Sequence, residues 1–515
     1  MEMNRGLQKL DELKTRARLG GGKDKQDKLR QEGKLTAWER IKSLVDRDTF
    51  LELNTLAEMM PTEFGPSPKP VPGDGVVTGF GKVGGRQVAI FAHDRTVMGG
   101  SLGNVQAAKI TAVLQKAGEM GIPVIGLQDS VGARIQEGNK NVGFDAIFRA
   151  ITRSSGIIPQ ISAIFGTCAG GVAYASGLMD FVLMVRKKSH LFITGPNVIR
   201  AVTHEEIDVE GLGGADVHMD KSGICDLAAD DDDGCIALIR KLLGYLPDNC
   251  YQLPPDVPTR DDPGRTNDEL VDFIPSDPRK YYDVRKLIKN IADDQEFLEI
   301  KPRFARNIVV GFARLAGRTL GVVANQPRHL AGSLDVDGSD KAARFIRFCD
   351  CFHIPILTLV DVPGFLPGVD QEHRGIIRHG AKMLYAYAES DVPKVTLILR
   401  KNYGGGKQAM CSKPIGSDLV LAWPTAELAV MGAEGAVDVI CRREIGQSDD
   451  PEQTRQRLIR EYEEIFGGPF ESARKMYVDD VIRPRDTRRI LIRAFEILIQ
   501  KRFSHLKRMH GNMPV

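Results

Sequence analysis

The stretch Ile161-Ser-Ala-Ile-Phe-Gly-Thr-Cys-Ala-Gly170-Gly171 predicts the element on which the fold is organised. Apolar residues lead into a turn of small residues, and an apolar run of helical length follows, so we expect a buried strand, a tight turn and a helix start. The backbone amides of such a turn point outward, and glycine lets a ligand oxygen approach them without meeting a Cβ atom. Together with the helix dipole, the amides of Gly170 and Gly171 would stabilise an oxyanion. Taken alone, so short a stretch more often marks a purely structural glycine turn.

The same order of segments occurs twice in the chain. The segment 122–129 (Ile-Pro-Val-Ile-Gly-Leu-Gln-Asp) reappears as 354–361 (Ile-Pro-Ile-Leu-Thr-Leu-Val-Asp), and the Gly-Ser-Leu segments at Ser101 and Ser333 are separated by the same offset. A second glycine loop, Gly404-Gly405-Gly406, follows the first at nearly that offset. The repeat predicts two similarly folded halves, each with one pocket of backbone amides. Two such pockets indicate a reaction in which two carbonyl oxygens gain charge.

Short apolar strands alternate with helical segments in both halves, which predicts an α/β fold. Residues 1–46 carry apolar positions at helical spacing, and we expect a helical arm over this range. Residues 247–278 are rich in Pro, Asp and Asn, and they predict the linker between the halves. The expected domains are therefore an N-terminal domain over residues 1–260, which includes the arm, and a C-terminal domain over residues 261–515.

Composition excludes several classes of protein. A net charge of +2, from 70 basic and 68 acidic residues, argues against a nucleic-acid-binding protein. No apolar run reaches the roughly 18 residues of a membrane span, and the N-terminus is charged from Glu2 onward. The 8 cysteines are scattered, and the acidic run 230–233 precedes a helical segment whose first turn favours acidic residues. We expect no metal site, no disulfide framework and a cytoplasmic location, or an equivalent reducing compartment.

The loop after the predicted strand 122–128 is a candidate ligand site, because α/β proteins bind ligands beyond the carboxyl ends of their strands. It contains Gly132, Ala133 and Arg134. Arg134 could contact a phosphate or a carboxylate of a ligand, or form a structural ion pair with Glu137, and both possibilities stay open. The segment 79–84 matches the pattern Gly-x-Gly-x-x-Gly, but a strand follows where a dinucleotide site needs a helix.

Five ordered motifs give the chain a family resemblance. They are Asp74-Gly-Val-Val-Thr-Gly79, Asp129-Ser-Val-Gly-Ala-Arg-Ile-Gln-Glu-Gly138, Cys168-Ala-Gly-Gly171, Phe192-Ile-Thr-Gly-Pro196, and Ala422-Trp-Pro424 with Val430-Met-Gly-Ala433. From Lys34 to the C-terminal segment, the chain resembles the carboxyltransferase (beta) subunits of biotin-dependent acyl-CoA carboxylases, and propionyl-CoA carboxylase beta subunits are closest in pattern. The resemblance implies two tandem crotonase-like domains, in agreement with the repeat. It also implies a homohexamer, a trimer of dimers, whose active sites lie between the N-terminal half of one subunit and the C-terminal half of another.

The resemblance implies a reaction as well. Carboxybiotin on a separate carrier protein releases carbon dioxide while an acyl-CoA loses its α-proton, with the biotin nitrogen as the implied base, and the enolate attacks the carbon dioxide. The implied oxyanion donors are the amides of Gly170 and Gly171 in one pocket and of Gly405 and Gly406 in the other. The implied substrate contacts are Gly132, Ala133, Arg134, Lys407 and Gln408. Biotin is the implied cofactor, with the CoA thioester as substrate.

The chain contains no Ala-Met-Lys-Met biotin-attachment sequence and no ATP-binding glycine loop that ends in Lys-Ser or Lys-Thr. We therefore expect a biotin carboxylase and a biotin carboxyl carrier subunit, or a membrane decarboxylase, as partners. Three positions depart from the family pattern: Val131 replaces a glycine, Lys407 a tyrosine and Gln408 an aspartate. Because this part of the family site is associated with acyl-chain preference, a carboxylated or otherwise polar acyl-CoA is a hypothesis. A Lys407 side chain that points into solvent is the alternative.

Three other functions remain as alternatives. A decarboxylase or transcarboxylase subunit would share the transition state, so the sequence does not separate the direction of the reaction. A crotonase-like hydrolase would need a nucleophilic serine in a Ser/His/Asp arrangement, which we do not expect for Ser101 or Ser333. A non-catalytic scaffold subunit is the third, and the two intact glycine pockets argue against it.

Overall fold

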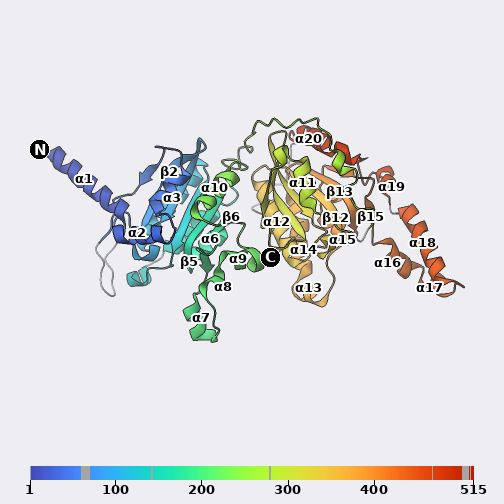
Figure 1. Ribbon diagram of the computed structural model, residues 1–515, viewed down its shortest axis with the longest axis horizontal. Helices are drawn as coiled ribbons and strands as arrows, with labels where there is room; N and C mark the ends of the chain where they lie inside the picture. Colours follow the sequence, from blue (N-terminus) through green and yellow to red (C-terminus); the bar gives the residue numbers. More distant parts are fainter. Residues whose placement is uncertain are drawn as a thin grey trace. The chain divides into compact units, whose positions relative to one another are not determined.

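The computed structural model describes residues 2–59, 70–140, 143–277, 280–466, 468–501, 510 and 512–514 (Figure 1). The chain divides into two compact units, Met1–Gln252 and Leu253–Val515. Each unit is built on one eight-stranded sheet. The predicted boundary after residue 260 thus falls a few residues inside the second unit.

The sheet of the N-terminal unit follows the order β1-β2-β3-β4-β5-β6-β8, and β7 pairs with the end of β5. The first three strands are antiparallel, and the remaining pairs are parallel. Its strands are β1 (Leu51–Leu53), β2 (Val76–Val83), β3 (Arg86–His93), β4 (Val124–Ser130), β5 (Gln160–Ala169), β6 (Phe181–Val185), β7 (His190–Phe192) and β8 (Leu227–Ala229). β4 is buried along its whole length, as the continuous apolar run predicts for a central parallel strand.

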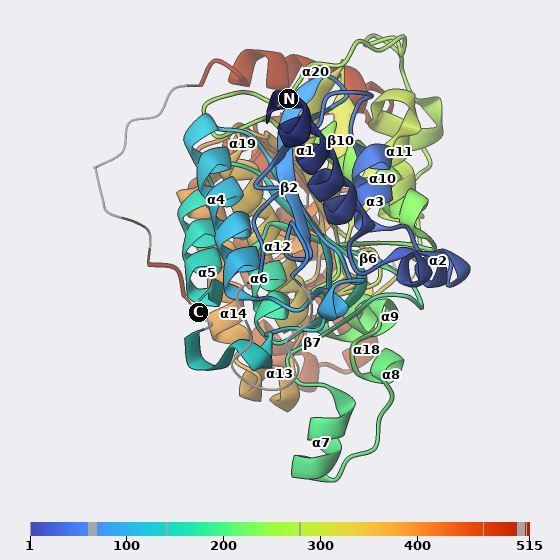
Figure 2. The ribbon, with the colours of Figure 1, turned by 90° about the vertical axis from the view of Figure 1, so that its left-hand side faces the viewer.

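Helices cover both faces of this sheet. The arm consists of α1 (Glu2–Leu19), α2 (Lys23–Gln31) and α3 (Ala37–Leu44), and α3 begins with the capping box that its Thr-x-x-Glu pattern predicts. α4 (Asn104–Met120) and α5 (Gly143–Ser154) pack on one face, and α3 and α10 (Asp232–Leu243) lie on the other (Figure 2). The shorter helices are α6 (Gly171–Leu178), α7 (Pro196–Thr203), α8 (Val209–Gly213) and α9 (Ala215–Val217).

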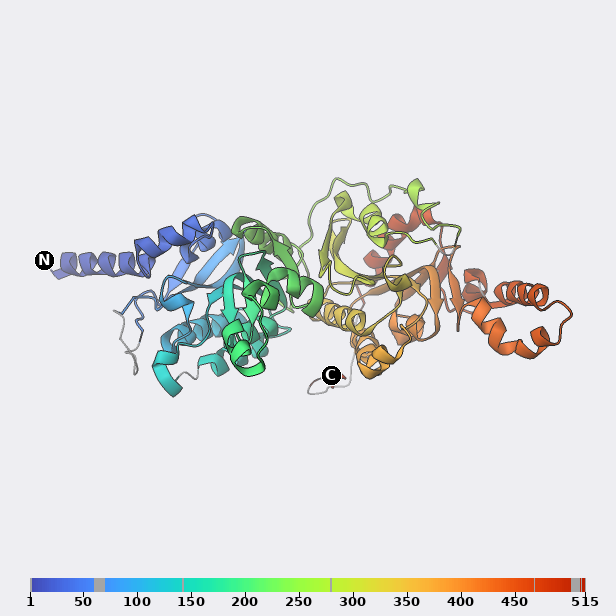
Figure 3. The same cartoon turned by 60° about the horizontal axis from the view of Figure 1, so that its bottom comes forward.

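The sheet of the C-terminal unit repeats this topology, in the order β9-β10-β11-β12-β13-β14-β16 with β15 paired to β13. Its strands are β9 (Phe297–Ile300), β10 (Ile308–Leu315), β11 (Arg318–Asn325), β12 (Ile356–Val362), β13 (Lys394–Tyr403), β14 (Leu419–Ala422), β15 (Glu427–Ala429) and β16 (Asp480–Val481). Its helices are α11 (Val284–Ile291), α12 (Val336–Cys351), α13 (Val369–His373), α14 (Ile376–Glu389), α15 (Gly404–Ala409), α16 (Ala433–Ile440), α17 (Arg442–Gly446), α18 (Pro451–Phe466), α19 (Pro469–Arg474) and α20 (Thr487–Leu498). The hairpin formed by α16, α17 and α18 projects from the unit and has its own small apolar core (Figure 3).

Strand register confirms the predicted duplication. Ala89 pairs with Val124 in the first sheet, and Gly321 pairs with Ile356 in the second. Gly321 follows Ala89, and Ile356 follows Val124, by the same number of residues that separates Asp361 from Asp129. The central parallel pair is irregular at matching points, opposite Asp129 in the first sheet and opposite Asp361 in the second. The two halves therefore share even their local departures from regular pairing.

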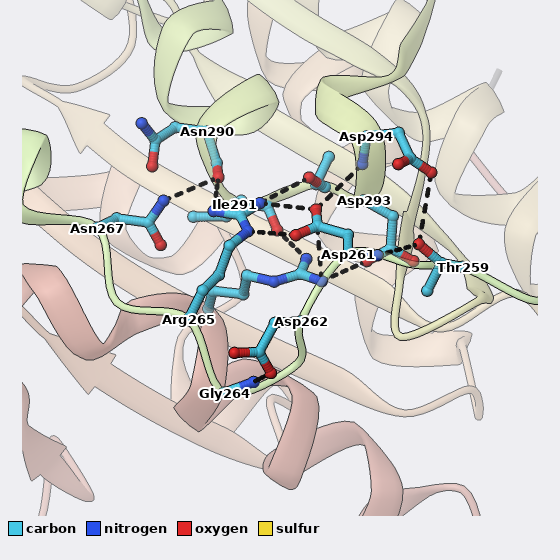
Figure 4. A network of polar contacts seen from close by, with 12 residues as sticks. Thr259, Asp261, Asp262, Gly264, Arg265, Asn267, Asn290, Ile291, Asp293 and Asp294 are labelled. Atoms are coloured by element: carbon cyan, nitrogen blue, oxygen red, sulfur yellow. Dashed lines mark hydrogen bonds and ion pairs between the residues drawn. The ribbon is translucent and has the colours of Figure 1, made fainter.

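A network of buried charges fixes the segment after Gln252 to the C-terminal unit (Figure 4). Arg488 of α20 is fully buried, and its Nη2 donates to Asp293 Oδ1 at 2.6 Å. Asp293 also accepts the amides of Ala316 and Gly317, at 3.0 and 2.7 Å. Two residues of the segment join this network: Asp261 Oδ2 lies 3.7 Å from Arg488 Nη2, and Arg265 Nη1 donates to the carbonyl oxygen of Asn290 at 2.9 Å. The predicted linker 247–278 is thus, in most of its length, an ordered part of the second unit.

Candidate functional site

The first glycine turn joins the end of β5 to the start of α6. Gly170 has φ 62° and ψ −129°, a backbone conformation that favours glycine. Its amide donates to the carbonyl oxygens of Phe192 and Ile193, both at 3.1 Å, because β7 pairs with the end of β5. Gly170 is therefore not an available oxyanion donor in this structure, which corrects the expectation from the sequence.

The amides that follow Gly170 are available. Neither Gly171 nor Val172 donates to an acceptor among the described residues, and both stand at the start of α6, where amides have no intrahelical partner. A Cβ atom at residue 171 would overlap the ring of Phe144, so this position requires glycine for packing as well as for access. The first half thus presents the amides of Gly171 and Val172.

The second glycine turn has the same construction at the start of α15. Gly404 has φ 51° and occupies the position in its turn that Gly170 has in the first, so Gly405 and Gly406 match Gly171 and Val172. No described residue accepts the amides of Gly405 or Gly406. A Cβ atom at residue 406 would lie 2.8 Å from Val362 Cγ2 and 3.0 Å from Gly364 Cα. Each half therefore has two consecutive amides without an acceptor among the described residues at a helix start, an arrangement that can stabilise a developing oxyanion.

Gly132 and Ala133 lie beside the first turn. Gly132 has φ 101°, its amide donates to Ser130 Oγ at 3.3 Å, and a Cβ atom there would stand 3.0 Å from Ala169 O. Ala133 is exposed and bridges to Leu102. The loop after β4 therefore packs directly against the end of β5, and it offers an exposed backbone surface next to the turn.

Arg134 does not reach a ligand. Its side chain is fully buried, and its Nη1 lies 2.7 Å from Asp74 Oδ1 and 2.9 Å from Glu137 Oε1. Its Nη2 donates to the carbonyl oxygen of Ser101 at 2.9 Å. Of the two possibilities that the sequence left open, the structure shows the ion pair, and Arg134 holds the loop after β4 instead of contacting substrate.

Lys407 and Gln408 line a pocket at the second glycine turn. Lys407 is half-buried, its Nζ stands 5.3 Å from the centroid of the Tyr477 ring, and burial lowers the pKa of its ammonium below the ordinary value. No carboxylate of the described residues lies within 4 Å of it. Gln408 is exposed. The pocket is lined by Gly404, Gly405, Lys407, Gln408, Leu428, Ala429, Val430, Tyr462, Ile465, Glu471, Ser472, Lys475 and Tyr477.

Ser101 is not placed as a nucleophile. The segment Gly99–Gly103 formally matches Gly-x-Ser-x-Gly, yet Ser101 is only 5% exposed and its carbonyl and hydroxyl face the Arg134 guanidinium. No histidine of the described residues hydrogen-bonds to it. A hydrolase triad would need that histidine contact.

Two functional features escaped the sequence analysis. The amide of Val172 was missed because its side chain is apolar, although the alignment of the two turns places it opposite Gly406. Tyr477, which contacts Lys407, comes from the distant segment after α19, and no sequence pattern joins the two.

Across the described residues no group of three or more His, Cys, Asp or Glu side chains could hold a metal ion. No helix in the described part of the chain combines the length and apolar character that a bilayer crossing requires.

Comparison with known proteins agrees with this geometry. The carboxyl transferase domain family matches residues 28–513. The chain is 51% identical to the carboxyltransferase subunit of propionyl-CoA carboxylase from Haloferax mediterranei, over 100% of both chains. It is 47% identical to methylmalonyl-CoA decarboxylase subunit alpha from Propionigenium modestum, over 99% of each.

A solved structure matches the fold. The crystal structure of transcarboxylase 12S, described as a hexamer with methylmalonyl-coenzyme A and methylmalonic acid bound, superposes with a TM-score of 0.96. It is 46% identical and covers 99% of this chain and 98% of that one. The chain therefore belongs to the carboxyl transferase domain family, and it is a biotin-dependent acyl-CoA carboxyltransferase built as two tandem crotonase-like domains.

Proposed function

We propose that this chain carboxylates a short-chain acyl-CoA, with carboxybiotin on a separate carrier protein as the carboxyl donor. The observation that carries the proposal is the pair of matching turns, each with two consecutive amides that have no acceptor among the described residues. The reaction places charge on two oxygens, the thioester carbonyl and the biotin ureido carbonyl. One turn for each oxygen accounts for the duplicated fold.

The proposed steps balance without a metal or a redox partner. The N–C bond of carboxybiotin breaks and releases carbon dioxide, and the freed ureido nitrogen takes the α-proton of the acyl-CoA. The resulting enolate attacks carbon dioxide and forms the new C–C bond. The amides of Gly171 and Val172 hold one oxygen, and those of Gly405 and Gly406 hold the other. Gly132 and Ala133 line the approach to the first turn.

Assembly and partners follow from the same proposal. We propose a homohexamer, because the hexameric transcarboxylase 12S shares this fold at 46% identity over nearly its whole length. Biotin carboxylase and biotin carboxyl carrier subunits would supply the carboxybiotin, and the cytoplasm is the proposed location. Size measurement on the purified chain, together with co-purification of a biotinylated partner, tests this assembly.

Lys407 supports a polar or carboxylated acyl group as the preferred substrate. A half-buried ammonium without a carboxylate within 4 Å favours an anionic or polar ligand group in its pocket, since desolvation of the charge is then compensated. Lys407→Met keeps the length of the side chain and removes its charge. We expect this variant to lose preference for polar over simple acyl-CoAs by about tenfold, a typical value for one charged contact.

The experiment that tests the function is a transfer assay on the purified chain with a panel of acyl-CoAs and their carboxylated products. Carboxylation of one acyl-CoA in the presence of carboxybiotin supports the proposal and identifies the substrate. Turnover only from carboxylated acyl-CoA to biotin would favour a decarboxylase or transcarboxylase subunit. Preference for simple short acyl-CoAs that Lys407→Met leaves unchanged would reject the role of Lys407.

A further inference from the structure

Each half buries one aspartate where its central parallel strand ends. Asp129 and Asp361 occupy matching positions of the repeat, and neither side chain is more than 1% exposed. In the C-terminal unit, Arg400 Nε and Nη2 lie 3.1 and 3.0 Å from Asp361 Oδ2. Arg400 belongs to β13, the strand that leads into the second glycine turn. That unit therefore balances its buried charge from within its own sheet.

The N-terminal unit has no arginine at the matching strand position. Gly166 stands in β5 where β13 has Arg400, and a Cβ atom at residue 166 would overlap the Asp129 carboxylate. The positive charge comes instead from Arg95, which follows β3, and from Arg40 of the helical arm. Arg40 of α3 is 1% exposed, and its Nη1 lies 3.6 Å from Asp129 Oδ2. Its Nε donates to Asp232 Oδ2 at 3.0 Å, which anchors the guanidinium.

Arg40 also packs on the part of β5 that precedes the first glycine turn. The register between β4 and β5 shifts at Asp129, so residues 165–167 bulge over its carboxylate. The Cζ atom of Arg40 lies 4.6 Å from the centroid of the Phe165 ring within this bulge. Pairing with β4 resumes only at Cys168, just before Gly170. A displacement of the bulge therefore moves the turn and the two amides that follow it.

A second cation, Arg95, also contacts Asp129, but its side chain is partly exposed to solvent. Arg95 Nη1 lies 3.0 Å from Asp129 Oδ1, and its side chain is 32% exposed. Arg40 is the cation that combines full burial, contact with the β5 bulge and an anchor in α10. Removal of one partner from so buried a group of charges leaves the others poorly compensated.

We propose that Arg40 is a positioning residue of the first glycine turn, so that the N-terminal arm controls one of the two substrate sites. The kinetic part of this inference rests on the proposed carboxyltransferase function. The structural part does not, and the two parts are tested separately.

Hydrogen exchange on the full chain tests the structural part. In Arg40→Gln we expect the amides of residues 165–172 to exchange at least tenfold faster than in the unchanged protein. Residues 399–406, the matching segment of the other half, should keep their rates and serve as the internal reference. Equal acceleration of both segments, or of neither, would overturn the proposal. Asp232→Asn weakens the anchor of Arg40 and leaves an amide oxygen that can still accept the Leu35 N–H, and it replaces Arg40→Gln if that variant does not fold.

Steady-state kinetics test the functional part. Arg40→Gln should reduce kcat/KM about 10- to 100-fold through one substrate only, acyl-CoA or biotin, and Arg400→Gln should act through the other, because each arginine serves one turn. Arg40→Lys keeps the charge but loses the planar fork, and we expect partial retention. Arg47→Gln, whose side chain is 95% exposed in the turn that follows α3, is the matched control and should retain full activity.

The outcomes separate the two claims. If the unchanged chain shows no biotin-dependent transfer, the proposed function fails, while hydrogen exchange still decides the role of Arg40. If Arg40→Gln folds and keeps both KM values and kcat within twofold, or if Arg40→Gln and Arg400→Gln impair the same substrate, the positioning role is rejected.

Discussion

Gly406 packs so closely on Gly364 that a Cβ atom at residue 406 would stand 3.0 Å from the Gly364 Cα atom. Gly406→Ala must therefore shift either the turn or the loop after β12. Because one misplaced oxyanion donor costs about 10²–10³ in kcat, we expect a loss of that size in the transfer assay. Gly435→Ala in α16 is the control, since its Cβ atom would meet Met431 Sδ only at an ordinary 3.7 Å and the residue is not an oxyanion donor. Equal losses in both variants would contradict the steric reason.

Gly171→Ala should also inactivate the enzyme, because its new Cβ atom overlaps the Phe144 ring. We expect the double change Gly171→Ala with Phe144→Leu to recover part of the activity, since the smaller side chain makes room for the methyl group. A double-mutant cycle on kcat/KM measures this coupling. Additive losses would show that the overlap with Phe144 is not what requires glycine here.

Arg134→Met should act on stability and leave substrate affinity unchanged. Removal of this fully buried guanidinium leaves the carboxylates of Asp74 and Glu137 uncompensated, and loss of one partner of a buried pair costs about 3–5 kcal/mol. Denaturant unfolding measures the loss, and the KM for acyl-CoA in the folded fraction should stay the same. Arg374→Met removes an ion pair whose side chains are 45% and 37% exposed, and as a control it should change stability by less than about 1 kcal/mol. A raised KM with intact stability would place Arg134 in the substrate site.

Asp261 should contribute to stability in a pH-dependent way. The hydrogen bonds from Arg265 and the nearby charge of Arg488 hold the pKa of the Asp261 carboxyl below its ordinary value. A carboxyl whose pKa is lowered in the folded state stabilises that state above the unfolded pKa of about 4, and this contribution is lost as the pH falls through the folded pKa. The difference in unfolding free energy between the unchanged protein and Asp261→Asn should therefore shrink as the pH is lowered from 5 to 3. A difference that stays constant would contradict the lowered pKa.

The duplicated fold could be predicted from the sequence because matching residues of the two similarly paired sheets are separated by one sequence offset. Asp129 and Asp361 are separated by the same sequence offset as the matching strand pairs Ala89–Val124 and Gly321–Ile356. The offset therefore predicts the register of one sheet from that of the other. The glycine turns could be located for a similar reason, since few other residues fit their conformation.

Details that depend on distant partners could not be predicted. The amide of Gly170 donates to carbonyl oxygens at the end of β7, a strand that follows α6 and β6 in the chain. The side chain of Arg134 forms a buried ion pair with Asp74, which lies 60 residues earlier in the chain. The local sequence around Arg134 therefore left two roles open. The charge at Asp129 is balanced by Arg95 and by Arg40 in the arm, whereas the repeat alone would suggest a partner in β5.

The most direct measurement is the transfer of a ¹³C-labelled carboxyl group between a carboxylated acyl-CoA and biotin, followed by mass spectrometry. We expect that the label moves to biotin, that this movement requires the purified chain, and that Gly171→Ala and Gly406→Ala each suppress it. Release of free CoA without biotin, with the label left on the acyl group, would instead show that the glycine turns form a hydrolytic site.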